Sequence, residues 1–307
     1  MAASSLDTVF LQNDQLRVAC RPGLGAKLVS MLDRRSGREW LLPSQLPGGT
    51  YLQPAYGADF SRFDTSGWDE CFPAVAAGPH PDAPITWPDH GELWSRPWRV
   101  EATPDSLTAC VQGQAWPYTL TRRASLDGET LCLDYTLQNN AHRPFLHVWS
   151  AHPLLRVTPG MRIQLPGEIR DAYVDWSSDP AHPAPGGWHA WPHWTPNVDL
   201  STVQPTALGL AVKLYFRRLS EGRCGLVDPD SGQALILSWD LAAAPYLGLW
   251  LCYGGWPTDG RPGHLTVALE PCSGMPDRLT DAVQMGTSAV LPSGGTKSWS
   301  VRLRSQL

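Results

Sequence analysis

The chain has 307 residues, of which 42% are hydrophobic, with 29 prolines, 28 glycines and a formal net charge of −5. The apolar content is sufficient for a packed core, which excludes an intrinsically disordered protein. The slightly acidic balance shows no basic patch for nucleic acid, and no apolar run is long enough for a transmembrane helix, so neither nucleic acid nor membrane is expected as a partner.

Alternation of apolar and polar side chains recurs along the chain and is typical of β-strands with one buried face. The segment LCLDYTLQ at 131–138 shows it clearly. In chain order, strands are expected over 8–13, 15–20, 26–32, 93–100, 116–124, 131–138, 208–217, 233–239, 246–253, 264–270, 283–291 and 299–304. Turn dipeptides such as Ser-Gly, Asp-Gly and Glu-Gly separate many of them. The pattern predicts an all-β, mainly antiparallel fold of stacked sheets, with residues 1–307 forming a single domain because no break in composition divides them.

Two long stretches, 43–92 and 171–200, show no clear strand pattern. The second is rich in proline and contains four tryptophans, Trp176, Trp188, Trp191 and Trp194. Long loops without regular structure are often functional in compact domains. The alternative is that the tryptophans simply pack the loop against the sheet.

The seven cysteines are odd in number and form no C-x-x-C pair, which suggests neither a zinc clip nor a disulfide framework. We expect small buried side chains in a reducing environment. Because the N-terminal residues also lack the basic and apolar regions of a signal peptide, a cytoplasmic protein is expected.

Metal and cofactor sites find little support in the sequence. His182, His189 and His193 cluster in the tryptophan-rich stretch, but Pro192 disfavours a helix and no carboxylate stands between them. No nucleophile elbow, P-loop or dinucleotide-binding glycine pattern is present. We therefore expect no cofactor and no metal.

Three expected strands each place small residues beside one large polar or aromatic side chain. Glu270 shares a strand face with Ala268 and Thr266. By the same alternation, Lys213 lies on the face of Gly209 and Ala211, and Trp250 on the face of Gly248. Such a surface is typical of a concave ligand site, and the alternative is an outer face in contact with solvent.

Other candidate residues stand in short motifs that carry little information alone. His152 precedes a proline directly after an expected strand, and His90 precedes Gly91, which permits a tight turn. Asp69 and Glu70 are adjacent carboxylates in an aromatic-rich segment.

In combination, these motifs resemble the aldose 1-epimerase (galactose mutarotase-like) family. The similarity rests on GWDECFP at 67–73, DHGELWSRPW at 89–98, AHPL at 151–154 and ALEP at 268–271, and it extends from about residue 10 to residue 305. The resemblance implies a large antiparallel β-supersandwich. It also implies an isomerase that interconverts the α and β anomers of an aldose by acid–base-catalysed ring opening.

The resemblance further implies roles for individual residues. His152 corresponds to the general acid, Glu270 to the general base and His90 to a sugar-binding histidine. At the last position the galactose-specific members carry Asn-His-x-His-Gly-Gly, and their substrate-binding arginine has no counterpart here, where Asp69 and Glu70 occur instead. Galactose preference is therefore open.

Further substrate contacts are expected from side chains that suit a sugar. Lys213 is a candidate for a hydroxyl or a carboxylate, and Trp250, Trp68 and Trp94 are candidate platforms for the sugar ring. The expected partner is a monosaccharide or a sugar phosphate.

Two alternatives stay open. One is an epimerase of hexose 6-phosphates, for which Arg62 or Arg96 would bind the phosphate. The other is a non-catalytic carbohydrate-binding protein of the same fold. A polysaccharide lyase is disfavoured by the lack of a signal peptide and of a basic groove.

Overall fold

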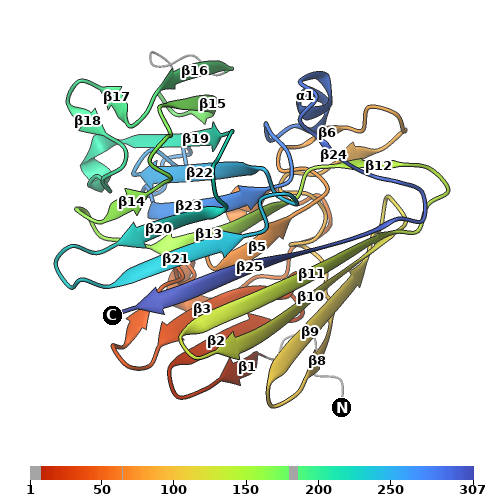
Figure 1. Cartoon of the computed structure of the whole chain (residues 1–307), viewed down its shortest axis with the longest axis horizontal. Helices are drawn as coiled ribbons and strands as arrows, with labels where there is room; N and C mark the ends of the chain where they lie inside the picture. Colours follow the sequence, from red (N-terminus) through yellow and green to blue (C-terminus); the bar gives the residue numbers. More distant parts are fainter. Residues whose placement is uncertain (1–7, 64, 180–185) are drawn as a thin grey trace.

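Two antiparallel β-sheets stack face to face in the computed structural model, which describes residues 8–63, 65–179 and 186–307 (Figure 1). The larger sheet has eleven strands, in the order β1 (Val9–Gln12), β2 (Leu16–Arg21), β3 (Lys27–Asp33), β5 (Trp68–Cys71), β13 (Ser150–Arg156), β23 (Leu265–Cys272), β22 (Tyr246–Tyr253), β19 (Leu210–Phe216), β15 (Asp171–Ser177) and β16 (Gly187–Ala190), with β4 (Arg38–Glu39) paired to β3. The smaller sheet has eight, in the order β14 (Arg162–Gln164), β20 (Arg223–Val227), β21 (Ala234–Trp239), β25 (Thr296–Gln306), β11 (Thr130–Asn139), β10 (Tyr118–Asp127), β9 (Ser106–Gln112) and β8 (Arg99–Ala102).

The remaining regular elements are short. Three strand pairs, β12 (Phe145–His147) with β24 (Ala289–Leu291), β17 (His193–Thr195) with β18 (Val198–Asp199) and β6 (Gly78–Pro79) with β7 (Thr86–Trp87), stand apart from the two large sheets. The helical elements among the described residues are α1 (Leu279–Gln284), η1 (Pro47–Gly49), η2 (Phe60–Arg62) and η3 (Thr206–Leu208). None of these helices has the length and apolar content needed to cross a lipid bilayer.

The core lies between the two large sheets and is built from alternate residues of their strands. Leu247, Leu249 and Leu251 of β22 are fully buried in it, and Leu131 and Leu133 of β11 approach from the smaller sheet. Alternation leaves the opposite face of β22 free for other side chains. The predicted all-β, antiparallel fold is confirmed.

Several details of the predicted elements are wrong. Most of 93–100 lies outside strands, since β8 begins only at Arg99, and 283–291 combines the end of α1 with the short strand β24. His152 lies within β13 instead of after a strand. The proline-rich region 171–200 contains four strands, of which β15 and β16 extend the larger sheet. The sequence pattern did not predict β15, because its alternation of Ala172 and Val174 with polar neighbours is short and is followed by Trp and Pro residues.

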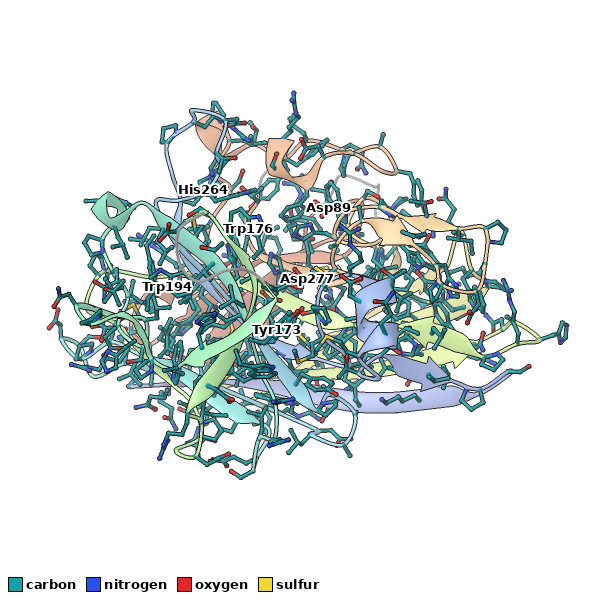
Figure 2. The ribbon with its side chains drawn as sticks, turned by 90° about the horizontal axis from the view of Figure 1, so that it is seen from above. Asp89, Tyr173, Trp176, Trp194, His264 and Asp277 are labelled. Atoms are coloured by element: carbon teal, nitrogen blue, oxygen red, sulfur yellow. The ribbon has the colours of Figure 1, made fainter. Side chains whose placement is uncertain are left out.

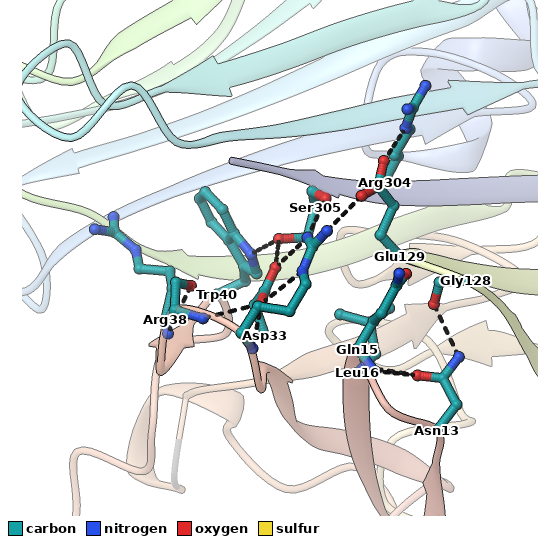
Figure 3. Close-up of polar contacts among 12 residues, drawn as sticks. Asn13, Gln15, Leu16, Asp33, Arg38, Trp40, Gly128, Glu129, Arg304 and Ser305 are labelled. Atoms are coloured by element: carbon teal, nitrogen blue, oxygen red, sulfur yellow. Dashed lines mark hydrogen bonds and ion pairs between the residues drawn. The ribbon is translucent and has the colours of Figure 1, made fainter.

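A buried polar cluster joins the two sheets at one end (Figure 3). Asp33 ends β3, and its carboxylate accepts a hydrogen bond of 2.6 Å from the Ser305 hydroxyl on β25. The Trp40 indole donates to the same Ser305 oxygen at 2.8 Å, and Arg35 forms an ion pair with Asp33 at 2.6 Å. Burial disfavours the charge, but the hydrogen bonds from Arg35 and Ser305 outweigh it and lower the pKa of Asp33 to about 2.

Asp33→Asn should therefore lower the free energy of unfolding by about 2 kcal/mol at pH 7. The reason is that the native structure stabilises the ionised Asp33 carboxylate more than the unfolded chain does. A carboxyl with a lowered native pKa stabilises above its unfolded pKa, and this contribution is lost as the pH falls toward about 2. Urea unfolding at pH 7, 4 and 2.5 should thus show the wild type and Asp33→Asn converging in acid. The exposed Asp127→Asn on β10 is the control, and a difference that is constant across these pH values would contradict the assignment.

Candidate active site

One lateral row of the larger sheet brings the main candidate residues together. His152 on β13 is the register partner of Asp69 on β5, and Glu270 on β23 is the partner of Gly248 on β22. Strands β13 and β23 are paired on either side of His152 and Glu270, which places these two residues opposite each other. Pro153 has no N–H to donate, and the ladder is interrupted at this point.

The Glu270 carboxylate stands at the centre of a buried polar network. Its Oε1 atom lies 3.2 Å from Nδ1 of His152, and its Oε2 atom accepts hydrogen bonds from the Lys213 ammonium and, at 3.0 Å, from the Ser150 hydroxyl. A Cβ atom at Gly248 would lie 3.3 Å from Oε2 of Glu270. Glycine at position 248 thus leaves the space that this carboxylate occupies.

The charges of this network stabilise one another. Burial opposes ionisation of Glu270, but the Lys213 ammonium and the His152 ring outweigh it and lower the pKa of Glu270 to about 2. Burial likewise opposes the charge of Lys213, whereas the carboxylates of Glu270 and Asp277 raise its pKa above the usual value. At neutral pH the network therefore contains an ionised Glu270 and a protonated Lys213.

His90 approaches the same region from a loop. It adopts a φ of 59° in the left-handed region, which is uncommon for a residue with a side chain and is found at functional sites. Its ring stacks on Phe60 at a centroid distance of 3.9 Å and lies 5.3 Å from the His152 ring. Burial lowers the pKa of His90, but the carboxylate of Asp89, 3.0 Å away, is the main cause of a net increase.

A cavity of about 570 Å³ opens above this face of the sheet. His152 and Lys213 line it, with aromatic walls provided by Phe60, Trp250 and Trp256. Viewed from above, Asp89, Trp176, His264 and Asp277 reach this cavity from separate segments (Figure 2). Glu270 is fully buried and contacts both His152 and Lys213.

Solved structures with the same architecture exist. A proposed aldose 1-epimerase from Escherichia coli K12 superposes with a TM-score of 0.71 at 16% identity, covering 98% of this chain and 99% of its own. A galactose mutarotase-like protein from Lactobacillus casei ATCC 334 gives 0.71 at 16% identity, covering 98% and 100%. A galactose mutarotase related enzyme from Lactobacillus acidophilus gives 0.70 at 12% identity, covering 98% of each chain. The chain has the galactose mutarotase-like fold. No protein-family model and no curated protein matches the sequence.

Within this mutarotase-like fold, His152, Glu270, His90, Lys213 and Trp250 meet at one place. All but Glu270 line the cavity, and Glu270 contacts two of them. The predicted common face for Glu270, Lys213 and Trp250 matches the observed register, in which Trp250 pairs with Lys213 and with Ala268 beside Glu270.

Asp69 and Glu70 occupy different environments because adjacent residues of a strand point to opposite faces. Asp69 is buried beside His152 in the register and forms an ion pair of 2.9 Å with Lys27. Glu70 points into the core between the sheets, where it accepts hydrogen bonds from Arg122, Tyr135, Trp149 and Trp68. The structure therefore places Glu70 away from the cavity, and Asp69, although it lies on the other face of the strand, is not among the residues that line the cavity.

The three tryptophans predicted as platforms for the sugar ring lie in different environments. Trp250 lines the cavity, whereas Trp68 is fully buried in the core and Trp94 packs edge-on against Phe60 and Phe63. Sequence reasoning did not assign most of the other lining residues to the site, among them Phe60, Asp175, Trp256 and Asp277. Their only common signal is an abundance of aromatic and acidic residues in segments without clear strand alternation.

Metal-binding residues do not gather in the described part of the chain, which contains no group of three or more His, Cys, Asp or Glu side chains suited to a metal ion. His189 lies on β16 and His193 on β17, and His182 lies outside the described residues. The seven cysteines, all within the described ranges, are free thiols.

Proposed function

We propose that this protein is an aldose 1-epimerase that interconverts the α and β anomers of an unphosphorylated aldose. The observation that carries the proposal is the facing pair of His152 and Glu270, 3.2 Å apart, at a cavity with aromatic walls. An acid and a base held together suit a reaction that needs one proton removed and another delivered. The mutarotase-like fold of the whole chain supports the same class of reaction.

In the proposed mechanism, Glu270 accepts the proton of the anomeric hydroxyl while the protonated His152 donates a proton to the ring oxygen. The C1–O5 bond breaks and gives the open-chain aldehyde, which rotates about C1–C2. Ring closure on the other face returns both protons. Oε1 of Glu270 and Nδ1 of His152 are both buried and lie 3.2 Å from each other, and neither atom forms an aligned hydrogen bond within the described part of the chain.

The charges around the cavity favour a substrate without phosphate. Five aspartates line it, against two permanent cations, Lys213 and Arg278, of which Lys213 is paired with Glu270. The side chain of Arg62 is 79% exposed and pairs with Asp59, and Arg96 donates to the carbonyl of Gln112. A phosphate dianion would therefore meet repulsion at the cavity instead of a cluster of cations.

The test is exchange between anomers, measured by NMR for glucose, galactose, other aldoses and glucose 6-phosphate. We expect the protein to accelerate exchange of at least one free aldose above its spontaneous rate, and to act less efficiently on glucose 6-phosphate. Efficient exchange of glucose 6-phosphate would assign the phosphorylated class instead. Sugar binding without acceleration would favour a carbohydrate-binding protein and overturn the enzymatic proposal.

A further inference from the structure

Strand β15 contains a β-bulge at the wall of the cavity. Val174 pairs with Leu214 of β19, but the next register pair is Trp176 with Lys213, so Asp175 is an additional residue opposite a regular partner strand. A bulge breaks the two-residue alternation and turns side chains to a new direction. As a result, two adjacent residues, Asp175 and Trp176, both line the cavity.

The additional residue meets a second carboxyl group from a distant segment. Asp175 is hydrogen-bonded to Asp277, which arrives on the loop after β23. Asp277 accepts a hydrogen bond from the Tyr215 hydroxyl, and its Oδ1 atom lies 3.8 Å from Nζ of Lys213. Two carboxyl groups in such contact cannot both ionise readily, so they share one proton.

The aromatic neighbour of Asp175 is positioned for a sugar ring. Trp176 is 37% exposed, and its ring lies 5.6 Å from that of Trp250, which also lines the cavity. Aromatic faces pack against the C–H faces of sugars, and carboxyl groups bind their hydroxyls. The bulge thus places a platform and a hydroxyl-binding group side by side.

We propose that the Asp175–Asp277 carboxyl pair is a specificity-determining element that binds neighbouring hydroxyls of the sugar, while Trp176 and Trp250 contact its ring. The pair orients the substrate over His152 and Glu270 and transfers no proton to it. This inference rests on the proposed function for the nature of the ligand, and it concerns binding alone.

A shared proton makes sugar binding sensitive to pH. Burial, followed by the charge of Asp277, raises the pKa of Asp175 to about 8. The ionisable groups around the pair include Lys213 and Tyr215 on β19, Tyr173 on β15, Glu270 and Cys272 on β23, Cys71 on β5, Arg278 and Asp281 at α1, and His90. Among them, Lys213 opposes the rise in the pKa of Asp175. Below about pH 8 the pair keeps one proton and one charge, whereas above it the second ionisation removes the donor and adds repulsion.

The experiment measures Kd by NMR titration with D-glucose and D-galactose between pH 6.5 and 9. We expect the wild type to bind about tenfold more weakly at pH 9 than at pH 7, because about a tenth of the pair then keeps its proton. Asp175→Asn imitates the protonated acid and should bind with little change over this range. Asp175→Ala should bind about tenfold more weakly at pH 7. Asp171→Asn, an exposed substitution on the same strand, should retain the wild-type pH dependence.

Deoxy analogues of glucose identify the hydroxyls concerned. An analogue that lacks a contacted hydroxyl should lose affinity for the wild type and lose little for Asp175→Ala. Wild-type pH dependence in Asp175→Asn, unchanged affinity in Asp175→Ala, or no binding of either sugar to the wild type would overturn the inference. These measurements report sugar binding and not catalysis. If the binding results were as expected but the protein did not accelerate anomer exchange, only the proposed enzymatic function would be rejected.

Discussion

Replacing Glu270 with glutamine should lower the catalysed rate of anomer exchange by about 10²–10⁴-fold, the usual contribution of a general base. Glutamine has nearly the same shape and can still accept a hydrogen bond from Ser150, but its amide cannot take the proton of the anomeric hydroxyl. Exchange by NMR at pH 7, with wild type and variant at equal concentrations of folded protein, measures the effect. Near-wild-type exchange in the variant would remove Glu270 from the role of base.

Glu70→Gln is the matched control for the loss of a buried, ion-paired carboxylate. Glu70 pairs with Arg122 at 2.9 Å in the core and lies away from the cavity. We expect this substitution to lower the melting temperature, since it leaves Arg122 without its buried counter-charge. Exchange per folded molecule should stay near the wild-type value, which separates loss of stability from loss of chemistry.

Lys213→Met should move the acid limb of the pH–rate profile toward neutral pH. The ammonium of Lys213 is the main group that keeps Glu270 ionised despite burial, so its removal raises the pKa of Glu270 from about 2. A base is inactive when protonated, and each pH unit below the new pKa should therefore lower kcat/KM about tenfold. In the wild type, Glu270 stays ionised well into the acid range and should impose no such limb above about pH 3.

Polarimetry or NMR exchange between pH 4 and 9 tests this expectation. Lys297→Met is the matched control, because Lys297 is a partly buried lysine on β25 of the smaller sheet, whereas Glu270 lies on β23 of the larger sheet. The Lys297 ammonium donates to the Ala243 carbonyl. The Lys297→Met variant should keep the wild-type profile. Superimposable acid limbs in Lys213→Met and wild type would show that Lys213 does not control the protonation of Glu270.

Strand alternation predicted the shared face of Glu270, Lys213 and Trp250 because the side-chain period of a strand is fixed at two. It did not predict which strands are neighbours, so the alignment of His152 opposite Glu270 appeared only through the family resemblance and the register. The same alternation shows why Asp69 and Glu70 were poor joint candidates. Once 68–71 is recognised as a strand, only one of two adjacent carboxylates can face the cavity.

Sequence reasoning missed Asp175 and Asp277 because local alternation carries no information about their positions. The bulge at Asp175 adds a residue that breaks the alternation, and a broken pattern in a short sequence is indistinguishable from a loop. Asp277 depends on a loop that returns to the cavity after β23, and its pairing with Asp175 spans about a hundred residues of chain. Long-range contacts of this kind leave no local signal in one sequence.

The residues of the site differ in how readily their positions tolerate substitution. His152, Glu270 and Lys213 are held by central strands of a hydrogen-bonded sheet, whereas Phe60, His90 and Asp277 arrive on connecting segments. Loops accept substitutions, insertions and deletions far more readily than central strands do. Under the proposed function, a change of sugar would therefore require only a remodelled rim, while His152 and Glu270 keep their spacing on the central strands.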